Sequence, residues 1–133
     1  MKISVAKAQA ILDDRADKAF RLLVFAAHKS IVEKTPVKTG RARGNWMVSV
    51  GSPQWSEQES DKSPGGRITI MREFAKRNEV DIEETAYIIN GVEYVPHLER
   101  GTDKFPPFGM IAVTEQELKA KIAEVAALVR QAS

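Results

Sequence analysis

The sequence predicts an α+β fold: a small antiparallel β-sheet flanked by a long N-terminal helix and a C-terminal helix, with a flexible loop or arm at about residues 52–66. Three observations predict it. Apolar residues recur at helical spacing over residues 6–34 and again near the C-terminus, and short alternating segments lie between them. With 133 residues, 43% of them hydrophobic, we expect residues 1–133 to form a single domain with its own core.

Residues 6–34 are predicted to form one long helix, about 40 Å in length at the usual rise per residue. The run from Leu22 to Ala27 is apolar on every side of such a helix, so we expect it to be covered on two sides. We favour a protruding helix that bridges subunits, with Leu22 and Phe25 in the subunit interface. The alternative is a break near His28, with the apolar run buried inside one subunit.

The helix is expected to end at Thr35-Pro36, because the residue before a proline is pushed away from helical geometry. The loop that follows contains a glycine and three cations, namely Gly40, Lys38, Arg41 and Arg43. Alternating side chains then predict a half-buried strand over residues 45–50, with Trp46 on its inner face.

Residues 52–66 are rich in Ser, Pro and Gly, which predicts the loop or arm. Its large apolar side chain, Trp55, either folds back on its own subunit or anchors a neighbouring subunit. Residues 67–78 can form a short helix with Ile68, Met71 and Phe74 on one side, or can begin as a strand; periodicity does not separate the two.

A strand is predicted over residues 85–89, followed by a tight turn at Asn90-Gly91 and a returning strand over residues 92–94. Residues 96–100 are predicted to form one helical turn closed by Gly101. The final helix is expected to start at a capping box, Thr114 with Glu117, and to present an apolar stripe. These expectations complete the predicted order of elements.

The usual catalytic arrangements are not found, so we expect no enzyme, no cofactor and no metal site. The chain has no cysteine, and its two histidines, His28 and His97, lie far apart in the sequence. The sequence contains neither a phosphate-binding loop nor a Gly-x-Ser-x-Gly turn, and Glu83-Glu84 is expected to be a solvated surface. No stretch resembles a secretory signal or a membrane span, so we expect a soluble protein of a reducing compartment, without a membrane partner.

Charge is distributed unevenly along the chain. Residues 1–50 carry ten Lys/Arg and four Asp/Glu, or +6, and residues 51–133 carry ten and fourteen, or −4. Such a subunit can pack head to tail with copies of itself or turn its basic half toward a polyanion, although ordinary surface clustering explains the pattern equally well. One alternative function is therefore a small nonspecific DNA-binding accessory protein that uses the basic loop 34–43.

Three stretches together resemble the neck and tail-completion proteins of tailed bacteriophages, a family of head–tail joining and tail-terminator-like components. They are TPVKTGRARGNW at 35–46, YIINGVEYVPHLERGT at 87–102 and PPFGM at 106–110. The matching residues are Thr35, Pro36, Val37, Thr39, Gly40, Arg41, Arg43, Trp46, Asn90, Tyr94, Leu98, Glu99, Gly101, Pro107, Gly109 and Met110. Two departures are Lys38, where the family usually has an acid, and Glu93, where it commonly has a proline.

The resemblance implies a structural virion protein that forms a ring at the head–tail junction or at the top of the tail tube. Such a ring completes the tail and joins it to the head around the DNA channel. The implied partners are copies of the chain in a homohexamer, neighbouring neck or connector and tail-tube proteins, and genome DNA that passes through the lumen without sequence specificity. The implied location is the virion, and the host cytoplasm during assembly; a tail terminator and a separate neck ring both remain open.

We assign the candidate residues three roles. The fold-defining motif comprises Gly40, Trp46, Asn90, Tyr94, Leu98, Glu99 and Gly101. The candidate subunit interface comprises Leu22, Phe25 and Trp55. Lys38, Arg41 and Arg43 either form ion pairs with the acidic stretch 79–84 of the adjacent subunit, which we favour slightly, or line the DNA channel, or face solvent.

Overall fold

The computed structural model describes the backbone of residues 5–132 and the side chains of residues 13–128, 130 and 131. In chain order the elements are α1 (Val5–Lys34), α2 (Arg41–Gly44), β1 (Met47–Val50), η1 (Pro64–Gly66), α3 (Arg67–Phe74), η2 (Arg77–Glu79), β2 (Ala86–Ile89), α4 (Val95–Arg100) and α5 (Met110–Ala132). The α+β fold, with a small antiparallel sheet and long N- and C-terminal helices, is confirmed.

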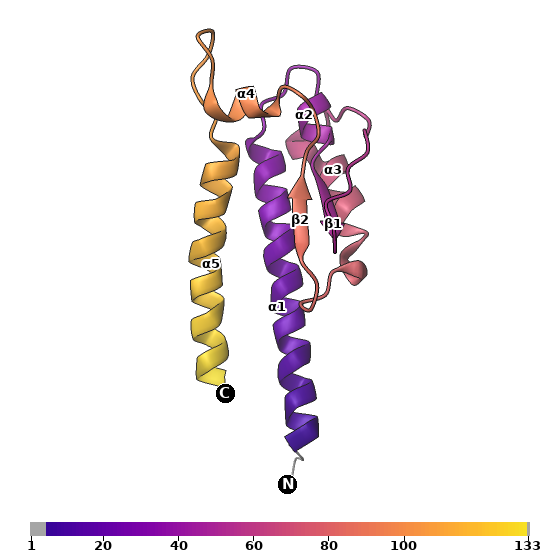
Figure 1. Cartoon of the computed structure of the whole chain (residues 1–133), viewed down its shortest axis with the longest axis vertical. Helices are drawn as coiled ribbons and strands as arrows, with labels where there is room; N and C mark the ends of the chain where they lie inside the picture. The colour runs from indigo at the N-terminus through magenta and orange to yellow at the C-terminus, as the bar shows by residue number, and fades with distance from the viewer. Residues whose placement is uncertain (1–4, 133) are drawn as a thin grey trace.

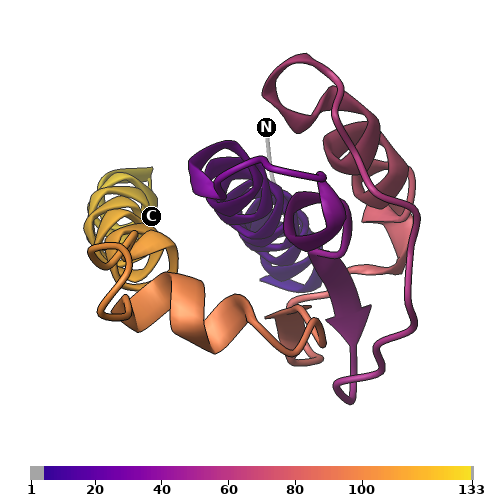
Figure 2. The ribbon, with the colours of Figure 1, turned by 90° about the horizontal axis from the view of Figure 1, so that it is seen from above.

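The long helix α1 lies at the centre of the molecule (Figure 1). Helix α5 runs beside it, and the two helices diverge toward the chain termini. The two-stranded sheet packs against another face of α1, and α3 lies beyond β1. Seen from above, α5 and α3 therefore occupy opposite flanks of α1 (Figure 2).

Helix α1 continues without a break through His28, whose buried Nε2 donates a hydrogen bond to the Trp46 carbonyl at 2.9 Å. The apolar run Leu22–Ala27 is not covered on every side. Phe25 is buried inside the subunit, edge-on to Phe74 with the ring centroids 5.5 Å apart, whereas Leu22 is 70% exposed. The expectation that Phe25 contacts a neighbouring subunit is therefore corrected, because its own subunit already covers it.

Strands β1 and β2 pair antiparallel, with Met47 opposite Ile89 and Val50 opposite Ala86. The predicted hairpin from 85–89 to 92–94 is wrong. The Asn90 side chain accepts a hydrogen bond from the Val92 N–H at 3.0 Å and donates one to the Ala42 carbonyl at 2.7 Å, which turns the chain into α4. A local side chain–backbone bond thus replaces the tight turn that Asn-Gly favours.

The two edges of the sheet differ. Residues of an antiparallel pair point their backbone groups alternately toward and away from the partner strand. The Gly51 N–H donates to the Thr85 carbonyl just beyond the ladder, so in this register the N–H groups of Val48 and Ile88 point outward. The buried Glu73 carboxylate of α3 accepts the hydrogen bond of the Val48 N–H at 2.8 Å and thereby covers the β1 edge.

The segment 52–66 is tied to its own subunit and is not an extended arm. Gln58 exchanges hydrogen bonds with the Asn45 side chain, and the Trp55 indole N–H donates to the Asn45 carbonyl at 3.0 Å. The Asp61 N–H donates to the Gly40 carbonyl at 2.9 Å. Trp55 also covers Gly91 and packs against the core, so its role as an anchor for a neighbouring subunit is corrected.

Helix α4 ends at Arg100 and is closed by Gly101, as predicted, but α5 begins at Met110 rather than at the predicted capping box. The Glu99 carboxylate accepts hydrogen bonds from the N–H groups of Ile111 and Ala112 at 2.8 and 2.9 Å, so it caps the start of α5. Thr114 is buried within the helix, and Glu117 bonds to α1 through Ser30 and Lys34.

Candidate functional site

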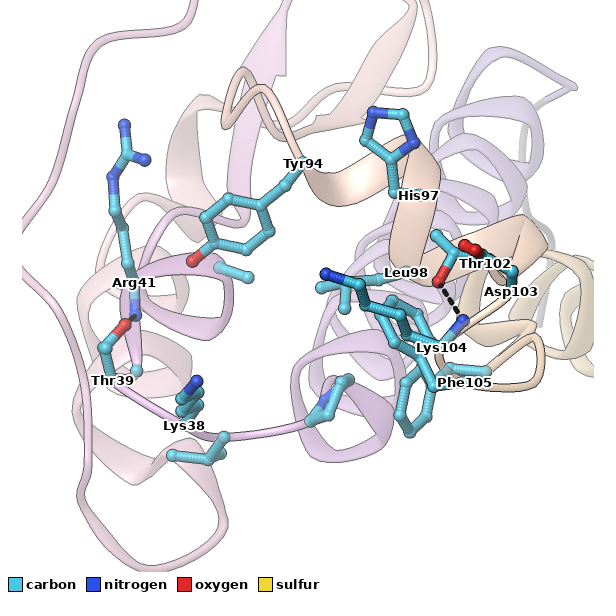
Figure 3. Close-up of a pocket in the computed structure, with 15 residues that line it drawn as sticks. Lys38, Thr39, Arg41, Tyr94, His97, Leu98, Thr102, Asp103, Lys104 and Phe105 are labelled. Atoms are coloured by element: carbon cyan, nitrogen blue, oxygen red, sulfur yellow. Dashed lines mark hydrogen bonds between the residues drawn. The ribbon is translucent and has the colours of Figure 1, made fainter.

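The three motif stretches meet at one end of the molecule, around a pocket of about 850 Å³ that we call the motif pocket. Loop 36–42 forms one wall, and α4 with the loop 102–108 forms the other. Figure 3 shows Arg41 and Tyr94 on one side and Leu98 with Phe105 on the other. The pocket is therefore an apolar hollow with a polar rim, built from segments up to about 70 positions apart in the sequence.

Glycines allow the walls of the motif pocket to approach other backbone segments closely. Gly40 has φ +81°, and a Cβ atom at this position would lie 2.4 Å from the Asp61 carbonyl oxygen. Gly101 has φ +79°, and a Cβ atom there would lie 2.6 Å from the Pro107 nitrogen. A side chain at either position would combine backbone strain with a steric clash.

The aromatic and apolar members of the motif pack against the core. Trp46 is buried and donates its indole N–H to the Thr35 hydroxyl at 2.8 Å. Tyr94 and Leu98 are half-buried; they pack against the same core cluster and also line the motif pocket. Together with the Asn90 bonds and the Glu99 cap, these contacts place all seven fold-defining residues in intrachain structural roles.

Arg41 is paired within its own chain. Its guanidinium bonds to Glu57 and Glu93, each at 2.8 Å, and lies 5.8 Å from the centre of the Tyr94 ring. The hydrogen bonds that Arg41 donates to Glu93 and then to Glu57 raise the pKa of Arg41, and the contact with Arg41 lowers the pKa of Glu93. The carboxylates that Arg41 meets are therefore not those of the stretch 79–84, which corrects the preferred ion-pair assignment for this residue.

Arg43 is only 7% exposed and donates hydrogen bonds to the backbone carbonyls of Asp61 and Ser63 at 3.2 and 2.5 Å. It therefore holds the segment after Trp55 and can neither line a channel nor reach another subunit. Lys34 pairs with Glu117 at 2.9 Å, whereas Lys38 is exposed at the rim of the motif pocket (Figure 3). Most of the positive charge of loop 34–43 is thus engaged inside the subunit.

In the described part of the chain, a pair of open apolar surfaces lies on opposite flanks, apart from a smaller hollow beside Leu22 and Leu128. The first, which we call the lateral groove, is a hollow of about 810 Å³ between α1, β2 and α5. Its apolar lining includes Phe20, Leu23, Ile88, Leu118, Ile122 and Val125. The second, the α3 face, consists of Ile68, Met71 and Phe74, of which Ile68 is 61% and Met71 64% exposed. The side of α3 that the sequence suggests as its buried side therefore faces solvent.

Sequence reasoning missed the buried carboxylates that organise this region. Asp61 is 3% exposed and accepts hydrogen bonds from both the N–H and the hydroxyl of Ser63 and of Thr69, at 2.5–2.9 Å. Burial raises its pKa, but these four bonds outweigh it and hold the pKa at about 2. The Asp-x-Ser spacing of an Asx turn was the available sequence signal for Asp61.

Glu73 was also missed, because it lies on α3 among residues typical of a solvated helix. Arg72 and Lys76 pair with its carboxylate at 2.7 and 2.9 Å. Burial raises the pKa of Glu73, and the hydrogen bonds from Arg72, Lys76 and the Val48 N–H lower it by more, so the net direction is downward. The carboxylate is therefore an ionised structural bridge between α3 and β1.

Comparisons with models of known protein families, with curated proteins and with solved structures find no match to this chain. Among residues 5–132, no helix has the length and apolar character to cross a membrane. In the same part of the chain, no group of three or more His, Asp or Glu side chains is arranged to hold a metal ion. The candidate functional features on the described surface include the motif pocket, the lateral groove and the α3 face.

Proposed function

We propose that this chain is a structural ring subunit of a tailed bacteriophage, located in the virion at the head–tail junction or at the top of the tail tube. The observation that carries the proposal is the meeting of three motif stretches. The segments 35–46, 87–102 and 106–110, which resemble the neck and tail-completion family, form one connected structure around the motif pocket. Segment 35–46 lies far along the sequence from the other two, and a chance match there has no reason to meet them in space.

The structure supports an assembling role in a second way. A monomer rarely leaves contiguous apolar surfaces open, and such surfaces usually mark interaction sites. The described part of this subunit leaves the lateral groove and the α3 face open, in addition to the motif pocket. In the proposed assembly the subunit joins copies of itself into a ring, a hexamer by resemblance, and contacts neck or connector and tail-tube neighbours.

The alternative function in DNA binding has less support. Arg41 is paired with two carboxylates, Arg43 is buried, and Lys34 is paired with Glu117. Genome DNA passing through a lumen needs only weak nonspecific attraction, which exposed cations such as Lys38 can supply. Ring order, and the choice between tail terminator and separate neck ring, come from the resemblance alone.

Disrupting the gene for this chain in the phage genome that encodes it tests the proposal. We expect filled heads and unjoined tails in electron micrographs of the lysate, and infectious particles again when the intact chain is supplied in trans. A Leu98→Asp chain, altered in the motif pocket, should fail to restore them, and a Glu115→Ala chain, altered on the exposed face of α5, should succeed. Complete, infectious particles without the chain would contradict the proposal.

A further inference from the structure

We infer that the α3 face of one subunit docks into the lateral groove of the next copy. This inference rests on the proposed ring and names the surfaces that form it. Because the two surfaces differ, the contact is heterologous: each subunit offers its α3 face on one flank and its groove on the other. Figure 2 shows α3 and α5 on opposite flanks of α1, as such a chain of contacts requires.

The α3 face is unlike an ordinary surface helix. In an amphipathic helix the apolar side faces the core. Here the positions buried in the subunit are Thr69 and Glu73, which hydrogen-bond to Asp61 and to β1, while Ile68 and Met71 face solvent. Ile70 packs against the core and Phe74 contacts the Phe25 ring, so Ile68 and Met71 are the apolar side chains of α3 that are left to a partner.

The lateral groove exists because α1 and α5 diverge. At the upper end of α5, Met110 and Thr114 are buried against the rest of the subunit. Further along the same stripe, Leu118 and Val125 line the groove and Ile122 is about half exposed. The sheet covers α1 but does not reach across to α5, so the apolar stripe of α5 stays open on this side.

Charge favours a second copy of this chain as the occupant. The α3 face is bordered by the exposed cations Arg67 and Arg77. The groove lining includes Ile82 and Glu84, in the exposed stretch 81–84, which contains three carboxylates; against them stands one cation of the described lining, Arg130 of α5. Docking α3 there brings Arg67 and Arg77 near these carboxylates around an apolar centre and covers the α3 face and the lateral groove in one contact.

A competing occupant is an extended segment of another protein that adds a strand to β2. The Ile88 N–H points outward at this edge, and strand addition would satisfy it. The second copy is the stronger inference, because strand addition leaves the α3 face of every subunit uncovered. The two occupants predict different effects of a substitution on α3. The substitution would weaken docking of a second copy, but it would not affect a foreign strand bound in the groove.

Cysteine pairing provides the test, since the chain has no native cysteine. We would mix Met71→Cys chains with Ile122→Cys chains at high concentration and oxidise them. We expect disulfide-linked pairs in the mixture and little linkage in either variant alone, because like surfaces do not meet. A mixture of Met71→Cys with Lys38→Cys, an exposed position at the other end, is the matched control. Linkage of either single variant with itself, or no linkage above the control, would overturn the inference.

A second measurement uses Met71→Lys, a change at an exposed position that should leave the circular dichroism spectrum unchanged. We expect loss of rings in electron micrographs and in native mass spectrometry, with a folded monomer remaining. Rings that persist in this variant would overturn the docking of α3 but leave the proposed function standing. Complete particles after disruption of the gene would refute the proposed function itself, so the two failures are distinguishable.

Discussion

Asp61 is a carboxylate that stays ionised although the protein nearly removes it from solvent. Ser63 and Thr69 each supply an N–H and a hydroxyl to its two oxygens. An ionised group in such a position is tolerable only when all of these donors are in place. The residue therefore fixes the path of the chain from the Trp55 segment into α3.

We expect Asp61→Asn to lower the free energy of unfolding by about 2 kcal/mol, because a pKa held near 2 instead of 3.8 corresponds to that much differential stabilisation. The native pKa is depressed, so the stabilisation is present above about pH 4 and is lost as the pH falls from about 4 toward 2. Urea titrations at several pH values would measure it. Asp103→Asn, at an exposed loop position, is the control, and equal stability of the two variants would contradict the prediction.

His28 should make stability depend on pH in a higher range. Burial lowers its pKa below 6.5, against a smaller raising effect of its bond to Trp46 and of Glu73. As the pH falls through about 6.5, the unfolded chain gains a proton that the native His28 does not take up, so stability decreases. We expect the melting temperature to fall between about pH 7 and pH 5, and to fall less in His28→Gln, where the side chain does not titrate. Parallel curves for the two proteins would contradict this.

At the scale of elements, the start of α5 depends on a side chain from α4. Glu99 caps the first free N–H groups of α5, next to the positive end of the helix dipole. We expect Glu99→Ala to lower the free energy of unfolding by about 1 kcal/mol. Hydrogen exchange of the Ile111 and Ala112 amides should accelerate, whereas Glu115→Ala should leave both unchanged. Unaltered protection in Glu99→Ala would refute the cap.

The long helices, the first strand and α4 could be predicted from the sequence because their patterns are local. The start of α5 could not. Thr114-x-x-Glu117 has the residues of a capping box, but Glu117 instead bonds to Lys34, and the actual cap, Glu99, comes from another element. A cap that comes from another element cannot be recognised from the residue spacing at the start of the helix itself.

The side on which α3 packs could not be predicted for a related reason. Inferring which side of a helix is buried from apolar periodicity assumes that the core beside it is apolar and that no other subunit covers the helix. Here the Glu73 carboxylate accepts the Val48 N–H, which another strand beside β1 would otherwise bond. The polar side of α3 therefore faces inward. Among the candidate site residues, Phe25, Trp55 and Arg43 were misplaced because each has an intrachain contact that is distant in the sequence, with Phe74, Gly91 and Asp61 respectively.

At the scale of the whole molecule, the uneven charge along the sequence does not become a basic face at loop 34–43. We expect the isolated chain to bind DNA weakly and to lose that binding at ~150 mM salt. Lys38→Glu should weaken it further, because Lys38 is the exposed cation of this loop. Fluorescence anisotropy with a labelled duplex would measure both. Strong binding at ~150 mM salt would favour the DNA-binding alternative.

Because the subunit has open apolar surfaces, we also expect its thermal stability to depend on protein concentration. Association of native subunits stabilises them by mass action. We expect the melting temperature of the intact chain to rise with protein concentration, and that of Met71→Lys to stay constant. Differential scanning calorimetry over a range of concentrations would show the difference; the same dependence in both proteins would place the association elsewhere.

The divergence of α1 and α5 has a geometric consequence. With α3 of the next copy seated between them, the spread of the two helices acts as a wedge that sets the turn from one subunit to its neighbour. The apex of that wedge lies where Leu23 and Ala27 of α1 face Thr114 of α5, beside a cavity of about 20 Å³. A larger side chain at Thr114, which borders this cavity but does not line the lateral groove, would open the wedge without changing the contact surfaces. The packing at this position would then determine how many copies close the ring. A change there would yield rings of another size or an open spiral.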